Sequence, residues 1–132
     1  MLDNVAIARR YIQALASGAD ADALAEFLAP DVVQEEFPNR LLPHGATRDL
    51  AALQEGRRRG RALMRAETYD VLSAMAEGDR VAIELIWTGT VGAAIGPFTE
   101  GQQLRARFAI FLDFRGGRIV RQHNYDCFWP WD

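Results

Sequence analysis

Apolar side chains occupy every second position from residue 104 to residue 114, and this alternation constrains the fold more than any other pattern in the chain. The apolar set is Leu104, Ala106, Phe108, Ile110, Leu112 and Phe114. The positions between them hold Arg105, Arg107, Ala109 and Asp113, with Phe111 as the exception. Because successive side chains of a strand point to opposite faces, the pattern predicts a long strand with one buried face.

Neighbouring stretches extend this strand into a sheet. Residues 66–76 and 80–91 are predicted strands joined by a turn at Glu77-Gly78-Asp79, and residues 92–101 form a loop that contains Gly and Pro. After Gly116-Gly117 the chain continues from Arg118 as a last strand. Four consecutive strands connected in this way predict an antiparallel meander.

The N-terminal part of the chain predicts three helices and one further strand. The first helix is marked by apolar residues at three- and four-residue spacing: Val5, Ala8, Tyr11, Ile12 and Leu15. A short second helix covers residues 20–28 and ends before Pro30, and residues 32–37 form a strand. Thr47 is predicted to cap the third helix. The order predicts an α+β fold, a cone-shaped curved antiparallel sheet with the three N-terminal helices packed on its concave face.

Length and charge narrow the classes of protein to which the chain can belong. A chain of 132 residues is predicted to form a single domain over 1–132. Its net charge of -3 gives no reason to expect nucleic acid or an anionic membrane surface as a partner. No stretch approaches the ~20 apolar residues of a membrane span, and the first residues lack the apolar run of a signal peptide. We therefore expect a cytoplasmic protein.

Several short segments resemble the nuclear transport factor two-like superfamily, which includes ketosteroid isomerases, limonene epoxide hydrolases and SnoaL-like polyketide cyclases. In chain order they are residues 8–12 (ARRYI), 30–33 (PDVV), 36–38 (EFP), 117–120 (GRIV) and 124–126 (NYD). The resemblance runs over nearly the whole chain. It implies the cone fold, whose mouth takes a small hydrophobic molecule, and a homodimer formed through the outer face of the sheet.

The resemblance also implies two alternative functions. One is a cofactor-free isomerase, cyclase or dehydratase that acts by proton transfer on a hydrophobic carbonyl substrate. The other is a non-catalytic ligand-binding or dimerisation domain, since members of one fold differ in their chemistry. Convergence of the candidate residues on one cavity would favour the enzyme, and a cavity filled by side chains would leave only dimerisation.

Three residues fall at the catalytic positions of related families. Tyr11 matches the tyrosine that donates to the enolate oxygen in the isomerases, although it could simply pack on the apolar face of its helix. Glu36 matches the general base of the same enzymes, or is an exposed glutamate at a strand end. Asp126 lies in the region where cyclases and epoxide hydrolases carry a catalytic aspartate, and a count from the turn places that role at Cys127 instead.

Two departures separate this chain from its best understood relatives. The isomerases carry a second proton donor near position 110, where this chain has only Phe108, Ala109 and Ile110. The epoxide hydrolases need an Arg-x-Asp pair in the strand at 82–90, where this chain has ELIW at residues 84–87. Neither of these two reactions is therefore predicted in its usual form.

The turn at Gly116-Gly117 decides which face of the last strand meets the cavity. A two-residue loop pairs Phe114 with Ile119, turns His123 inward and sets Asp126 against Arg107. A three-residue loop shifts the register by one and brings the alternate set inward, namely Gln122, Asn124 and Asp126. The family resemblance favours the second arrangement.

The predicted substrate contacts follow from these patterns. Asn124 and Gln122 supply polar groups on the last strand, and Phe108 and Trp87 supply apolar wall from the two strands before it. His123 is an alternative contact or base if the register is the other one. Two histidines without a spaced partner and one cysteine give no reason to expect a metal site. The proton-transfer chemistry that the resemblance implies needs no cofactor.

Overall fold

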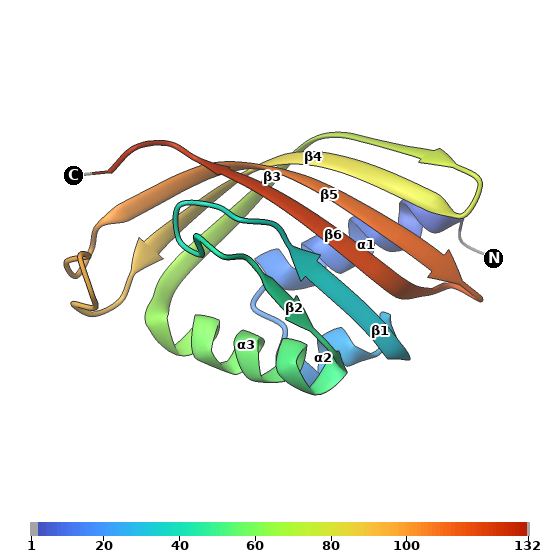
Figure 1. Ribbon diagram of the computed structural model, residues 1–132, viewed down its shortest axis with the longest axis horizontal. Coiled ribbons are helices and arrows are strands. Elements are labelled where there is room, and N and C mark those ends of the chain that lie inside the picture. The colour runs from blue at the N-terminus through green and yellow to red at the C-terminus, as the bar shows by residue number, and fades with distance from the viewer. Residues whose placement is uncertain (1–2, 132) are drawn as a thin grey trace.

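The computed structural model describes residues 3–131, which form three helices and six strands (Figure 1). The helices are α1 (Asn4–Ala16), α2 (Ala21–Ala25) and α3 (Leu50–Leu63). None of the helices within these residues is long and apolar enough to cross a membrane. The predicted second helix is shorter than expected, because the chain is already extended as a strand from Leu28.

An aspartate caps the N-terminus of each helix. The side chains of Asp3, Asp20 and Asp49 each accept the backbone N–H three residues ahead, at 2.8, 2.8 and 2.9 Å. The predicted cap of α3 was therefore wrong, since Thr47 lies in a short edge strand and Asp49 performs this role. An aspartate carboxylate also interacts favourably with the positive end of the helix dipole.

The six strands form one sheet in the order β2-β1-β6-β5-β4-β3. Its main part is the predicted antiparallel meander of β3 (Met64–Glu77), β4 (Arg80–Val91), β5 (Gln103–Arg115) and β6 (Arg118–Phe128). β1 (Leu28–Glu36) pairs in parallel with β6, and β2 (Ala46–Arg48) lies outside β1 as an antiparallel edge strand. The parallel pair is possible because α3 and the meander separate the two strands in sequence. The sheet is thus mixed, not wholly antiparallel as predicted.

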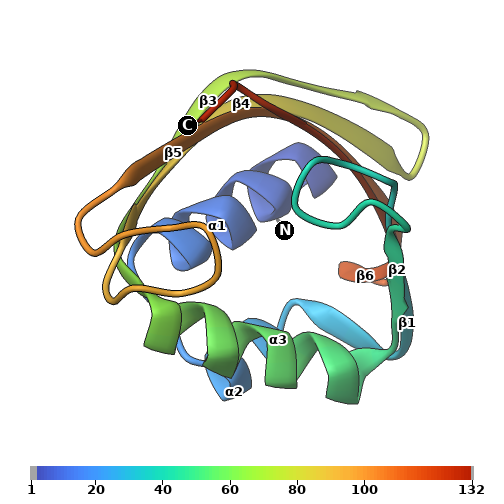
Figure 2. The same cartoon turned by 60° about the vertical axis from the view of Figure 1, so that its left-hand side comes forward.

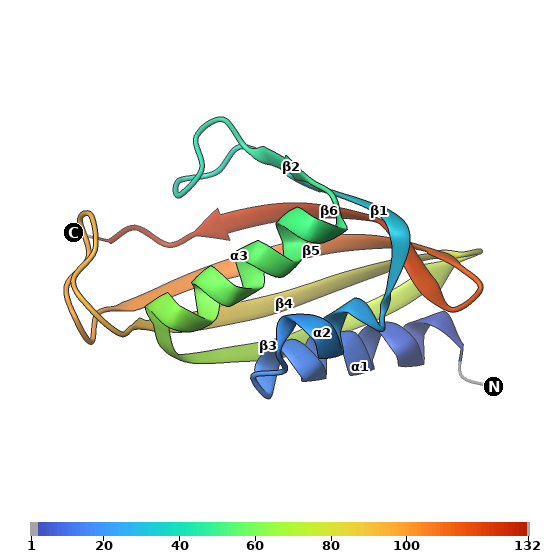
Figure 3. The ribbon, with the colours of Figure 1, turned by 90° about the horizontal axis from the view of Figure 1, so that it is seen from below.

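The sheet curves over the helices and holds the core against its concave face. Figure 2 shows β3 to β5 arching over α1, and Figure 3 shows α3 lying across the same face. Buried residues of the α1 face are Ala8, Tyr11 and Ile12, as the spacing predicted. They share one hydrophobic core with inward side chains of β4 and β5, among them Val81, Ile83, Leu85, Leu104, Ile110 and Leu112. The predicted fold class, a curved sheet with helices on its concave face, is therefore confirmed.

The register of β6 is set by a bulge next to the glycine turn. Gly116 and Gly117 both have positive φ, and the loop contains only these two residues, because Arg115 pairs with Arg118 and Phe114 with Ile119. The next pair is Asp113 with Arg121, so Val120 has no partner. This extra residue shifts all later positions of β6 by one.

Because of the bulge, the length of the loop does not by itself decide which side chains of β6 point inward. Phe108 pairs with Asp126, Ile110 with Asn124 and Leu112 with Gln122, so the polar set faces the apolar set of β5. The expected inward direction of these residues is confirmed, but its expected cause, a three-residue loop, was wrong. Arg107 pairs with Cys127 and not with Asp126.

Candidate active site

A cavity of about 310 Å³ lies between the concave face of the sheet and the helices. Its apolar lining includes Leu15, Leu24, Leu28, Leu53, Phe108 and Ile110. Its polar lining is unusually rich and includes Tyr11, Gln34, Glu36, Arg48, Arg57, Glu67, Tyr69, Gln122, Asn124 and Asp126. Side chains therefore leave room for a small molecule, with an apolar wall and several groups that can orient it.

Asp126 is the polar group of the cavity that is least well compensated. Its Oδ1 is buried and has no hydrogen-bond partner among residues 3–131. Burial raises the pKa of its carboxyl to about 7, the nearby charge of Glu36 adds to the effect, and Arg48 opposes it. In the sheet, Asp126 stands opposite the aromatic residue Phe108, which supplies no hydrogen bond to the carboxyl.

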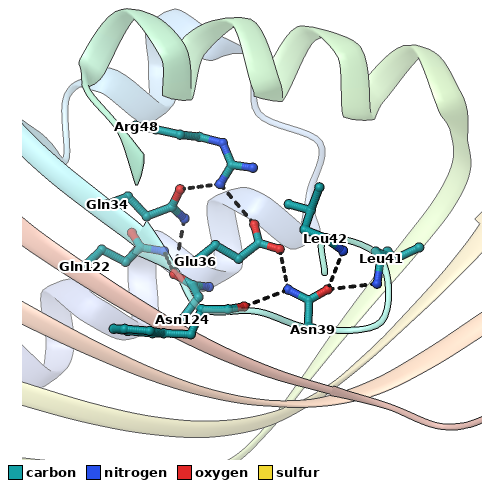
Figure 4. A network of polar contacts seen from close by, with 9 residues as sticks. Gln34, Glu36, Asn39, Leu41, Leu42, Arg48, Gln122 and Asn124 are labelled. Atoms are coloured by element: carbon teal, nitrogen blue, oxygen red, sulfur yellow. Dashed lines mark hydrogen bonds and ion pairs between the residues drawn. The ribbon is translucent and has the colours of Figure 1, made fainter. Parts of the chain in front are cut away.

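A chain of hydrogen bonds orients Asn124 on the same strand. The Tyr11 hydroxyl donates to Gln122 Oε1 at 3.0 Å, and Gln122 Nε2 donates to Asn124 Oδ1 at 2.9 Å. Gln34 Nε2 donates to the same Oδ1 at 3.1 Å (Figure 4). With its oxygen held by two donors, Asn124 directs its Nδ2 away from them, and this nitrogen donates to no described residue. The amide nitrogen of Asn124 is thus available to donate to a ligand.

Burial changes the pKa of Tyr11, the first residue of this chain of hydrogen bonds. It raises the pKa of Tyr11 to about 12, with the Gln122 hydrogen bond acting in the opposite direction. Tyr11 therefore keeps its proton at neutral pH. The sequence-predicted tyrosine is in the cavity, but its hydroxyl already has a protein acceptor.

Glu36 is held by its neighbours. Arg48 Nη1 donates to one carboxylate oxygen at 3.0 Å, and Asn39 Nδ2 donates to the other at 2.8 Å (Figure 4). Arg48 Nη1 also donates to Gln34 Oε1 at 2.9 Å, which joins this ion pair to the Asn124 network. Both oxygens of Glu36 are engaged, so Glu36 lines the cavity as part of a fixed charge pair.

A second polar cluster at the other side of the cavity was not predicted. Glu67 Oε2 accepts hydrogen bonds from Trp87 Nε1 at 2.8 Å and from the Tyr69 hydroxyl at 3.1 Å. Burial raises the pKa of Tyr69 above its usual range, with the Glu67 charge as the next cause. Glu67 and Tyr69 alternate on β3, so the period of two was the signal that could have placed them on one face.

Two of the predicted substrate contacts do not line the cavity. His123 lies on the opposite face of β6, with Nε2 3.8 Å from Glu35 and its ring edge-on to Phe37, so its predicted contact with substrate was wrong. The bulge at Val120 explains this, because it turns the other alternate set inward. Trp87 is buried behind the wall and stacks on Phe108 with ring centroids 5.8 Å apart. The other predicted site residues line the cavity together: Tyr11, Glu36, Phe108, Gln122, Asn124 and Asp126.

The arched sheet, the helices on its concave face and the polar cavity beneath it define a nuclear transport factor two-like fold. Within this class, the family model of the SnoaL-like domain matches residues 8–122, and the chain belongs to that family. A comparison with curated proteins returns no match. Within residues 3–131, no three His, Cys, Asp or Glu side chains gather as a metal site would require.

Several solved structures share this fold. A proposed polyketide cyclase from Xanthomonas campestris is 28% identical, with a TM-score of 0.76 over 92% of this chain and 88% of that one. IdmH, a proposed polyketide cyclase from Streptomyces antibioticus, is 23% identical, with a TM-score of 0.79 over 95% and 92%. A SnoaL-like polyketide cyclase from Agrobacterium tumefaciens is 18% identical, with a TM-score of 0.72 over 96% and 92%.

Proposed function

We propose that this chain is a cofactor-free enzyme that moves a proton on a small hydrophobic carbonyl compound, with Asp126 as its acid-base group. The observation that carries the proposal is the buried carboxyl of Asp126, which has an unpaired oxygen and a pKa raised to about 7. A group with such a pKa can take and return a proton near neutral pH. The SnoaL-like family and its cyclase neighbours support chemistry of the cyclase or isomerase type.

Asn124 is the proposed donor to the carbonyl oxygen of the substrate. It lies two residues from Asp126 on the same face of β6, and its Nδ2 is directed away from the two donors on its oxygen. Tyr11 contributes through Gln122, because that hydrogen bond fixes the amide of Asn124. A preorganised donor stabilises the negative charge that appears on the oxygen during proton removal.

The proposed reaction begins when the Asp126 carboxylate takes a proton from the carbon next to the substrate carbonyl. The electrons of the broken C–H bond form the enolate, whose oxygen accepts a hydrogen bond from Asn124 Nδ2. In an isomerisation the proton returns from Asp126 to a different carbon. In a cyclisation the enolate carbon attacks a second carbonyl, and that oxygen receives the proton. Glu36 is engaged by Arg48 and Asn39 and is not the base in this scheme.

The test uses hydrogen exchange, because exchange does not require the natural substrate. Conjugated cyclic ketones are incubated with the protein in D₂O, and deuterium at the carbon next to the carbonyl is measured by mass spectrometry. The wild-type protein is expected to accelerate exchange, and Asp126→Asn to remove the acceleration. Asp113→Asn serves as the matched control, because this aspartate pairs with Arg80 outside the cavity.

Two outcomes would count against the enzyme. Equal exchange with wild type and Asp126→Asn would remove Asp126 from its role. Binding of ketones without any acceleration would favour the alternative, a non-catalytic ligand-binding domain of the same fold.

We also propose that the chain forms a homodimer through the outer face of its sheet. An aromatic cluster lies there, in which Phe37 stacks on Tyr125 at 4.6 Å and Phe111 meets Tyr125 edge-on at 5.8 Å. Tyr125 is 43% exposed, which is a large accessible area for an aromatic side chain. Sedimentation at micromolar concentration should give a dimer that Tyr125→Glu dissociates, and a wild-type monomer would contradict the proposal.

A further inference from the structure

Arg57 is a cavity residue that the proposed reaction does not use. It comes from the middle of α3, the helix that lies across the concave face of the sheet (Figure 3). Its Nε donates to the carbonyl oxygen of Ala19 at 2.9 Å, and its Nη2 donates to that of Leu15 at 3.1 Å. These two contacts hold the guanidinium in one orientation. Nη1 donates to no described residue.

Arg57 forms no ion pair within residues 3–131, although three acidic residues line the same cavity. Glu36 is paired with Arg48. Glu67 accepts hydrogen bonds from a tryptophan and a tyrosine. Asp126 is the proposed acid-base group. Arg57 thus lines the cavity without an ion-pair partner of its own, and a ligand can supply the missing negative charge.

Arg57 and Asp126 reach the cavity from different elements. Arg57 comes from α3, with its guanidinium held against the carbonyl oxygens of Leu15 and Ala19. Asp126 comes from β6, where it stands opposite Phe108. A ligand that spans the cavity can therefore place its reacting carbon near Asp126 and an anionic group near Arg57, with its apolar body along Phe108 and Ile110.

We propose that Arg57 binds a carboxylate of the substrate, so that the substrate class is an apolar carbonyl compound that also carries a carboxylate. Nη1 is free to donate to a carboxylate oxygen, and the two backbone contacts fix the guanidinium before the ligand arrives. This inference rests on the proposed function for the position of the reacting carbon. The anion site itself does not depend on that chemistry.

The test compares two probes of nearly equal shape, 2-naphthoate and its neutral analogue 2-naphthamide. Binding is measured by calorimetry at about pH 6, where Asp126 mostly carries its proton. The wild-type protein is expected to prefer the carboxylate by roughly tenfold or more, the contribution of one charge-assisted hydrogen bond. Arg57→Met should remove this preference, and Arg57→Lys should keep part of it.

Arg58→Met is the matched control, because Arg58 is the next residue of α3 and pairs with Glu55 in solvent. It should leave the preference unchanged. If Arg57 only supports the end of α1 through Leu15 and Ala19, Arg57→Met will weaken both probes equally, which overturns the proposal. Equal binding of both probes by the wild type, or binding of neither, also overturns it. Deuterium exchange into neutral ketones tests Asp126 separately, so the anion site can fail while the proposed function stands.

Discussion

Replacement of Asp126 by asparagine should change how the stability of the protein depends on pH. The carboxyl of Asp126 has a pKa of about 7 in the folded chain, against an ordinary value of 3.8. The folded state therefore holds this proton more tightly than the unfolded state does. Its contribution to stability is complete below about pH 4 and is lost as the pH rises through about 7.

The size of the effect follows from the same two values. A pKa difference of about three corresponds to about 4 kcal/mol in the free energy of unfolding. Because the side chain of Asp126 keeps some contact with solvent, we expect about 2 to 4 kcal/mol. Asp126→Asn cannot ionise, so the variant should be about as stable as wild type at pH 4 and more stable at about pH 8.

Urea unfolding of both proteins between about pH 4 and pH 8 measures this difference. Asp31→Asn is an informative control, since Arg115 holds the pKa of the exposed Asp31 below its usual range. The small stabilisation from Asp31 is lost only as the pH falls below about 4, so Asp31→Asn should give a profile parallel to that of wild type over this range. Parallel pH profiles for wild type and Asp126→Asn would refute the description of Asp126 as a buried acid.

Four further substitutions test the site and the packing of the fold. Glu36→Gln should lower the pKa of Asp126 below about 7, measured by carboxyl NMR, because it removes the neighbouring negative charge. This variant should keep proton exchange; loss of exchange would instead make Glu36 the base. Tyr11→Phe should cost about 1–3 kcal/mol in urea unfolding, because it leaves a buried amide oxygen unpaired, and an unchanged stability would contradict the hydrogen-bond chain. Gly89→Ala should destabilise the folded protein by about 1–3 kcal/mol, because the new methyl group meets the ring of Trp87. Gly60→Ala in α3 has free space around it and should stabilise the folded protein by up to about 1 kcal/mol. Equal effects of the two substitutions in urea unfolding would contradict this packing.

Local patterns were enough to predict most of the fold. The alternation at 104–114 and the helical spacing around Tyr11 each reported a buried face, and the structure has both. The parallel pairing of β1 with β6 was not predictable in this way. It depends on where the last strand, β6, comes to lie relative to β1, and no local period of the sequence contains this long-range information.

The Asp126 side chain points into the cavity as predicted, but for a reason other than the predicted one. The two-residue loop alone would have turned His123 inward, and the bulge at Val120 reverses that result. Val120 looks like an ordinary strand residue in the sequence, so the bulge could not be predicted there. Its position depends on how the two faces of the sheet pack. The resemblance to SnoaL-like proteins carried the prediction where periodicity could not.

The remaining cavity residues come from elements far apart in the sequence. Arg48 reaches the site from the edge strand β2, and Arg57 reaches it from α3. From the sequence, Arg57 could equally have been a solvated arginine, since a cluster of arginines on a helix is usually exposed. Only the folded chain shows that Arg57 is turned toward two carbonyl groups of the α1–α2 region.

The most direct test of Asp126 as the acid-base group is the pH dependence of deuterium exchange into a ketone that the protein accepts. At substrate concentrations well below saturation, the rate reports the ionisation of the free protein. We expect the wild-type rate to rise with pH and to level off above an apparent pKa of about 7, and the Asp126→Asn rate to stay at the background level. An unchanged wild-type profile in Asp126→Asn, or a midpoint near pH 4, would contradict the account.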